Sequence, residues 1–384
     1  MTTTATHSPL LDQPGAVEGE GVDAGVAWHY GNPTAEQRAL EAGTAVVDLS
    51  QWGVVTVTGP DRLTWLDSLS TQAVAQLPPG ASSELMILSP QGRIEHVAAV
   101  VDTGSTAYLL TESAPQLAGF LDRMRFMLRV EVTDASDAWA VLGSAGAVPG
   151  VDADAVRWVD PWPGVTEGGT SYADPASAGG APWAWSLTLV PRDALASVVD
   201  RALASGATLA GTWALEALRI AAHRPRAARE VDATSLPHEL DWLRTAVHLH
   251  KGCYRGQETV AKVHNVGRPP RRLTLLHLDG SAHVLPAPGA PVMRGDGDQA
   301  REVGHVTSVS RHHDLGPIAL ALLKRSVDPT VELWVGAEGE PVSAAQELIV
   351  NAEGYSVDRP PPPGPTMKGL LMGKGCAADG GDMS

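Results

Sequence analysis

The chain has 384 residues, 43% of them hydrophobic and 19% charged, which is enough for two or three domains with sizeable cores. Its net charge of −16 argues against broad, non-specific binding to nucleic acid or to an acidic membrane surface. Two distant cysteines and the lack of a run of about 18 apolar residues argue against a disulfide framework and a membrane span, so we expect a cytoplasmic protein.

The first part of the chain alternates strand and helix signals. Residues 1–24 are rich in Thr, Gly and acidic side chains without periodicity, which predicts a disordered leader. Val54–Val57 has the composition of a strand, and Thr58–Asp61 resembles a helix start. Leu117, Leu121, Met124 and Leu128 stand at helical spacing and predict a further helix. Between these segments, strands are predicted at 85–88, 94–101 and 106–110.

A second round of the same pattern follows. Strands are predicted at 130–133, 138–142 and 184–190, and helices from Pro191 and over 212–222. The intervening stretch 148–180 is rich in Pro, Gly, Ser and Ala, and it is interpreted as a long surface excursion.

The composition changes after Pro269-Pro270. Short β-type segments at 273–278, 303–309, 318–323 and 331–335 alternate with turn residues, which favours a small all-β barrel or sandwich. Beyond Tyr355 the chain is Pro-rich and then Gly-rich, which predicts a disordered tail. The expected organisation is a leader (1–24), an α+β region (25–268), a small β domain (269–354) and a tail (355–384).

The octapeptide Lys-Gly-Cys-Tyr-Arg-Gly-Gln-Glu at 251–258 is the most informative stretch. It places Cys253 between two cationic side chains, and neighbouring positive charge favours the reactive thiolate. Gly252 and Gly256 are free to take a positive φ or to let another group approach the backbone. The alternative is a buried, inert cysteine on a turn, because free cysteines are among the most buried residues.

A basic segment surrounds this motif. Residues 219–272 contain 11 Lys or Arg against 5 Asp or Glu, although the whole chain is acidic. Such a segment either faces an anionic ligand or forms a solvated basic surface. A permanent metal site is not expected, because no second cysteine lies near His248, His250 and Cys253. The pair His312-His313 is interpreted as a polar turn with diverging side chains.

All eight positions of the octapeptide resemble the signature Lys-Gly-Cys-Tyr-x-Gly-Gln-Glu of the YgfZ family of folate-binding proteins. That family is related to the glycine-cleavage T-protein, an aminomethyltransferase. The region from Arg271 to Glu353 is similar to the family's C-terminal barrel. Earlier segments also resemble the family, namely Val47–Ser50, Val57–Asp61, Gly92–Ile94, Ala217–Ile220, Arg224-Pro225 and Leu236–Glu239.

The resemblance implies an α+β fold in which two intertwined, ferredoxin-like GcvT-type subdomains surround a central folate-sized hole, followed by a C-terminal β-barrel. It also implies tetrahydrofolate or a one-carbon derivative as the cofactor. The implied role is that of an accessory factor for iron–sulfur cluster assembly or maintenance, with iron–sulfur enzymes as partners, including those that thiomethylate tRNA. Direct contact with nucleic acid is not expected of so acidic a chain.

Two other functions stay open. One is a folate-dependent one-carbon transferase or demethylase related to aminomethyltransferases, and the other is an interaction scaffold without a ligand. Glu95 and His96 stand where aminomethyltransferases carry adjacent acidic residues. The Thr-Gly-Glu-type motif that helps to hold the pterin in the T-protein is not evident before Trp183–Val190. The sequence Ala221–Arg224 also departs from the Glu-x-Gly that is common at this position. These departures disfavour ordinary glycine-cleavage chemistry.

The candidate catalytic residues are Cys253, as a thiol that attacks a one-carbon adduct, undergoes redox chemistry or transiently binds iron or sulfur, and Lys251, as its supporting cation. Arg219 is expected to pair with the carboxylates of a folate tail, and a surface ion pair is the alternative. Glu239 or Gln257 is expected to bond the pterin edge, with a turn role as the alternative. The remaining candidate cofactor-binding residues are Gly252, Tyr254, Gly256 and Glu258, while Trp28 and Tyr30 line either the hole or a core.

Overall fold

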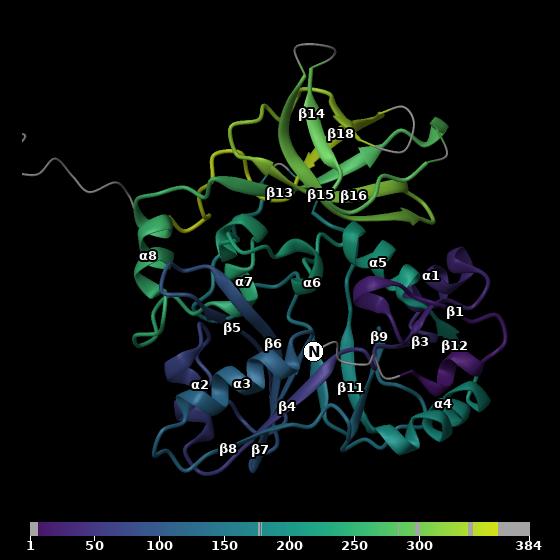
Figure 1. Cartoon of the computed structure of the whole chain (residues 1–384), viewed down its shortest axis with the longest axis vertical. Helices are drawn as coiled ribbons and strands as arrows, with labels where there is room; N and C mark the ends of the chain where they lie inside the picture. The colour runs from purple at the N-terminus through teal and green to yellow at the C-terminus, as the bar shows by residue number, and fades with distance from the viewer. Residues whose placement is uncertain are drawn as a thin grey trace, which may run out of the picture.

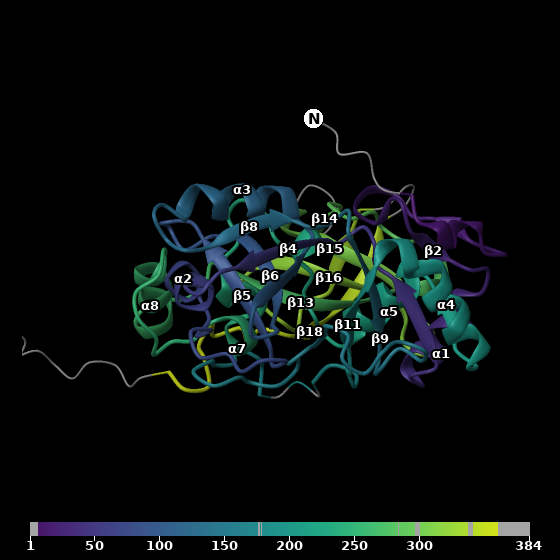
Figure 2. The same cartoon turned by 90° about the horizontal axis from the view of Figure 1, so that it is seen from below.

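The structure is a computed structural model that describes residues 7–175, 177, 179–282, 284–295, 300–336 and 341–359. A β-barrel lies above two five-stranded sheets, and short helices fill the space between them (Figure 1). In the view from below, the strands of the two sheets lie side by side with the barrel behind them (Figure 2). None of the described helices is both long enough and apolar enough to cross a membrane.

The first sheet is antiparallel and has the strand order β5-β6-β7-β4-β8. Helices α2 (Arg62–Leu69) and α3 (Ala114–Met124) cover one of its faces, because alternate strand residues form a core with both. The opposite face packs toward the second sheet. The strands are β4 (Gly53–Thr58), β5 (Ser82–Leu88), β6 (Ile94–Asp102), β7 (Thr106–Thr111) and β8 (Glu131–Asp134).

Helix α3 is shorter than the leucine stripe predicted. It ends at Met124, and Phe126 takes a left-handed backbone conformation with φ 46°. Leu128 therefore lies outside the helix and is exposed. A periodic stripe cannot reveal this stop, since the residue that ends the helix is neither Gly nor Pro.

The second sheet has the order β10-β11-β9-β3-β12, with β12 parallel to β3 and the other pairs antiparallel. Its strand β3 precedes every strand of the first sheet, so the chain leaves this sheet, builds the other and returns. The strands are β3 (Ala45–Asp48), β9 (Trp139–Ser144), β10 (Arg157–Val159), β11 (Ser186–Pro191) and β12 (Thr208–Ala210). The helices that contact this sheet are α1 (Pro33–Glu41), α4 (Leu195–Ala204) and α5 (Thr212–Ala221).

The C-terminal part is a closed barrel with the strand order β13-β16-β15-β14-β17-β18. Closure leaves no open sheet edge, and the inward-facing side chains form a single apolar cluster. The barrel that the sequence and the family resemblance predicted is thus confirmed. Its strands are β13 (Arg271–Leu278), β14 (Pro291–Arg294), β15 (Arg301–His312), β16 (Gly316–Lys324), β17 (Leu333–Val335) and β18 (Val342–Leu348).

The segment between α5 and the barrel connects all three parts. It contains α6 (Ala227–Glu230), α7 (Leu243–Ala246) and α8 (Gln257–Asn265), together with the 3₁₀ helix η4 (Pro237–Leu240). Its apolar residues share a core with β5, β6, β13 and β16. This position explains why most of the basic segment is packed inside the molecule rather than on a solvated face.

The expected leader is largely ordered, which corrects the expectation from composition. Residues Pro9–Asp12 and Gly21–Asp23 form short 3₁₀ helices, and β1 (Val17–Glu18) pairs with β2 (Ala27–His29). Leu10 is buried in the core beside α4, and Asp23 is fully buried against arginines. The average composition of a segment does not reveal single buried residues of this kind, which hold the segment against the rest of the protein. Residues 1–6 and 360–384 lie outside the described part of the chain, whereas 355–359 are described.

Candidate functional site

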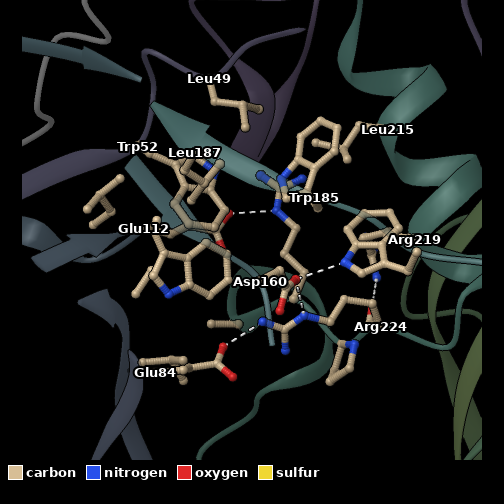
Figure 3. Close-up of a pocket in the computed structure, with 18 of the residues that line it drawn as sticks. Leu49, Trp52, Glu84, Glu112, Asp160, Trp185, Leu187, Leu215, Arg219 and Arg224 are labelled. Carbon is tan, nitrogen blue, oxygen red and sulfur yellow. Dashed lines mark hydrogen bonds and ion pairs between the residues drawn. The ribbon is translucent and has the colours of Figure 1, made fainter. Parts of the chain in front are cut away.

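A cavity lies where the facing sides of the two sheets meet the segment after α5 (Figure 3). The centre of a water-sized sphere can move through about 70 Å³ of it, within about 650 Å³ of space between atoms that includes open solvent. Val97 and Ala99 of β6 line one side, and Leu187 of β11 with Leu215 of α5 lines another. Strands from both sheets therefore contribute to a single cavity.

Five indoles form most of the cavity's aromatic surface. Trp183 and Trp185 stack with ring centroids 5.4 Å apart, and the Trp158 and Trp242 side chains are buried. Flat, apolar walls of this kind suit a planar ligand better than a flexible or globular one. The five are Trp52, Trp158, Trp183, Trp185 and Trp242.

Sequence reasoning missed most of this wall. The stretch 148–180, interpreted as a surface excursion, instead carries Trp158 into the cavity and Trp162 into the core beside it, each 3% exposed. The sequence did contain one signal, the excess of Trp over Phe, 11 against 2. Indoles so frequent in an acidic chain indicate a binding site lined by aromatic side chains.

Arg224 stands between two buried carboxylates of the cavity (Figure 3). Its Nε lies 2.9 Å from Asp160 Oδ2, and its Nη2 lies 2.6 Å from Glu84 Oε1. Burial raises the pKa of Asp160, an effect that the Arg224 charge opposes. Neither carboxylate was recognised from the sequence, because they come from β5 and from the end of β10 and meet only in the folded chain.

Arg219 also lines the cavity, but every N–H group of its guanidinium already donates a hydrogen bond within the protein. Nε and Nη2 donate to Glu216, Nη1 donates to Glu230 and to the Arg224 carbonyl, and Nη2 also donates to Ser308 of the barrel. All five N–H groups are thereby used. Arg219 consequently has no donor left for a ligand carboxylate, which differs from the tail-binding role that we expected.

The basic segment resolves into a buried ion-pair network. Four arginines meet six carboxylates, so the network carries more negative than positive charge and does not attract an anion by net charge. Burial raises the pKa of Glu216, but Arg219 and Arg226 outweigh it and hold that pKa at about 2. Its members are Arg219, Arg224, Arg226 and Arg229 with Asp23, Glu84, Glu112, Asp160, Glu216 and Glu230.

Lys251 anchors the octapeptide to the end of α2 rather than pointing toward the thiol. Its Nζ donates to the carbonyls of Asp67, Ser70 and Gln72 and forms an ion pair with the Asp67 carboxylate. Burial lowers the pKa of Lys251, and the Asp67 charge opposes that shift. The three ammonium hydrogens are therefore engaged at a helix C-terminus, where a cation is favourable.

Cys253 is exposed between two buried anchors. Tyr254 packs into the core on one side, and Lys251 holds the other. Arg255 pairs with the exposed Glu95, with Nη1 2.8 Å from Oε2. The thiol is thus accessible, while both neighbouring cations are paired with other groups.

Of the two glycines of the octapeptide, one lies where a side chain would clash and the other does not. Gly256 has φ 85°, and a Cβ there would lie 2.5 Å from the Ser89 carbonyl oxygen. Gly252 has open space around it. Gln257 and Glu258 begin α8, with Gln257 half-buried and Glu258 exposed, and neither lines the cavity.

Glu239 links the connecting segment to the barrel. It is fully buried, accepts from the Leu236 backbone N–H, and pairs with Arg271 at 2.8 Å. It does not line the cavity, so the structure assigns it an architectural contact. Trp28 stacks on Trp213 outside the cavity, at 5.6 Å between ring centroids.

Among the described residues, one group of three potential metal ligands lies close together, namely Glu41, His312 and His313. The two rings stack 4.5 Å apart instead of diverging as expected. His312 Nδ1 accepts from the backbone N–H groups of Asp314 and Leu315, which places the ring proton on Nε2. A protonated Nε2 has no free lone pair for a metal ion. We therefore interpret the contact between His313 and Glu41 as one that holds α1 against the barrel.

Family models identify two regions of the chain. The GCVT N-terminal domain matches residues 9–149, and the glycine cleavage T-protein C-terminal barrel domain matches residues 271–347. The first match begins inside the segment that we expected to be a leader, in agreement with the ordered 3₁₀ helix there.

Curated relatives include aminomethyltransferases and proteins named YgfZ, together with a putative transferase of Arabidopsis thaliana that is 26% identical over 80% of this chain and 73% of its own length. An aminomethyltransferase of Streptomyces coelicolor is 25% identical over 86% of this chain and 91% of its own length. A tRNA-modifying protein YgfZ of Vibrio atlanticus is 23% identical over 77% of this chain and 88% of its own. The crystal structure of glycine cleavage system aminomethyltransferase T from Bartonella henselae covers 89% of this chain and 95% of its own, with a TM-score of 0.68 and 17% identity, and it shows a shared fold.

Proposed function

Because this chain belongs to the group of proteins related to the glycine cleavage T-protein and YgfZ, we propose that it binds tetrahydrofolate and acts as an accessory factor in iron–sulfur cluster assembly or maintenance. The cavity between the two sheets is the proposed folate-sized hole. The indole-lined cavity with its buried carboxylates is the observation that carries this proposal.

The chemistry of the walls supports a pterin as the ligand. A pterin is flat, which suits stacking on Trp183 and Trp185. Its ring edge carries several N–H donors, which suit the acceptors of Asp160 and Glu84. Since the network around Arg219 is closed, the anionic tail is proposed to extend toward solvent rather than into this network.

Tetrahydrofolate binding is tested by calorimetric or tryptophan-fluorescence titration of the full chain. We expect saturable binding with quenching, because the ligand ring stacks against indoles. Absence of binding at millimolar tetrahydrofolate would contradict the proposal and leave a scaffold without a ligand.

Cys253 is proposed to be the reactive group of the iron–sulfur role. Its support is an exposed sulfur in a loop held rigidly at Lys251 and Tyr254. Deletion of the gene should lower the activity of iron–sulfur enzymes, and the wild-type gene should restore it. Cys253→Ala should fail to restore it, whereas Cys376→Ala, the matched substitution of the other cysteine, should succeed. Equal rescue by both variants would remove Cys253 from the proposed role.

The second candidate is a folate-dependent one-carbon transferase or demethylase, favoured by the long match to an aminomethyltransferase. Against it stands Glu95, which is exposed and paired with Arg255 instead of facing the cavity. Formaldehyde release from methylated glycines, or aminomethyl transfer, by the purified protein would favour this candidate over the accessory role.

A further inference from the structure

The carboxylates of Asp160 and Glu84 are saturated by donors from the protein itself. Asp160 Oδ2 accepts from Arg224 Nε and from Trp183 Nε1, and its Oδ1 accepts from the Trp162 backbone N–H. Glu84 Oε1 accepts from Arg224 Nη2, and its Oε2 accepts from Trp242 Nε1 and the Thr245 hydroxyl. A ligand donor can reach these oxygens only by replacing one of these groups.

Arg224 is the donor among these with an unused N–H group. Its Nη1 is buried and has no hydrogen-bond partner among the described residues, so its buried contacts are incomplete. The other donors are two indoles, a hydroxyl and a backbone amide, which are fixed by the fold itself. The guanidinium lies over the rings of Trp162 and Trp242, with its carbon 5.4 Å from each centroid. The position of the Arg224 guanidinium is therefore bordered by two aromatic rings and two carboxylates.

Such a place offers a cyclic guanidine the same acceptors that it offers arginine. The edge of a pterin consists of a ring N–H and an exocyclic amino group on one carbon, which is the donor pattern of a guanidinium fork. From this match we infer that Arg224 occupies, in the ligand-free protein, the position that the pterin edge takes in the complex. Arg224 must therefore release Asp160 or Glu84 when a pterin binds. Arg224 thus sets the affinity of the cavity, an inference that rests on the proposed folate function.

The charge balance agrees with this exchange. The network holds six carboxylates against four guanidiniums, so a ligand edge that donates hydrogen bonds is favoured over one that brings a negative charge. Arg224 lies three residues after the end of α5 and precedes Pro225. Its backbone N–H donates to the Arg219 carbonyl and its own carbonyl accepts from Arg219 Nη1, so the backbone is held and movement is left to the side chain.

The test compares wild type, Arg224→Ala and Arg244→Ala by titration with tetrahydrofolate, with and without guanidinium chloride at low millimolar concentration. Arg224→Ala should bind tetrahydrofolate at least 10-fold more tightly than wild type, and guanidinium should compete with it in this variant only. Arg244→Ala is the matched control: its guanidinium also lies over Trp162, at 4.5 Å, but pairs with Asp241 instead of Asp160 or Glu84. It should show neither effect.

The outcomes separate this inference from the proposed function. Binding by wild type that weakens in Arg224→Ala would overturn the inference, since Arg224 would then be a ligand contact, and would leave the folate proposal standing. No binding by either protein would overturn both. A saturable rise in the Tm of Arg224→Ala with guanidinium, absent from wild type, would establish that the variant folds with the vacated place intact.

Discussion

Arg255 and Glu95 join the loop that carries Cys253 to the strand that lines the cavity, with Nη1 and Oε2 2.8 Å apart. Glu95 lies on β6, and Val97 and Ala99, two and four positions further along this strand, both line the cavity. The octapeptide and the cavity are therefore parts of one structural unit, connected through a single strand.

Glu95→Gln tests how much this connection contributes. Both side chains are about one-third exposed, so the variant should lose less than about 1 kcal/mol of unfolding free energy. Because Lys251 and Tyr254 still hold the loop, the rate at which a disulfide reagent modifies Cys253 should change less than about two-fold. Urea denaturation and a thiol assay in a Cys376→Ala background measure both quantities. A large rise in thiol reactivity would mean that the ion pair, rather than the buried anchors, holds the loop.

Lys251→Met should cost about 2–3 kcal/mol, because it leaves carbonyls at the end of α2 without their donor. Urea denaturation measures the loss. Lys262→Met, which changes an exposed lysine of α8, is the matched control and should be nearly neutral. Equal stability of the two variants would contradict an anchoring role for Lys251.

Asp23→Asn should destabilise the protein by about 3 kcal/mol, since Arg226 and Arg229 lose a fully buried charge partner. It should also expose the segment before residue 24 to limited proteolysis. Glu20→Gln, at an exposed position of the same segment, should do neither. Unchanged proteolysis in Asp23→Asn would show that this ion pair does not hold the N-terminal segment.

His238 should make stability fall in acid. Burial lowers its pKa to about 3 in the folded protein, against an ordinary value of 6.5. Between these values the unfolded chain binds more protons, so the free energy of unfolding decreases as pH falls, by up to about 1.4 kcal/mol per pH unit. His238→Gln, followed by urea denaturation from pH 7 to pH 4, should have a shallower pH dependence than wild type. His250→Gln, at an exposed site, should retain the wild-type slope.

Local patterns in the chain predicted local structure well. The β-type segments after Pro269-Pro270 became the barrel strands, and the strands predicted at 85–88 and 94–101 became the paired strands β5 and β6. The octapeptide alone indicated the family, because a specific run of eight residues is a local property. It also indicated a cysteine between two cations, though not where those cations point.

Contacts between distant segments were beyond the reach of the sequence. Glu84, Asp160 and Arg224 are up to 140 positions apart, and nothing in their surroundings marks them as partners. The net positive charge of residues 219–272 suggested an anionic ligand or a solvated face, yet carboxylates from distant elements, Asp23 and Glu112 among them, help to neutralise it. A buried charge is stable only beside a compensating one, and which one is near depends on how the sheets pack. The chain's own order of residues therefore determined its strands, its barrel and its signature loop, whereas packing alone decided where its charges and indoles meet.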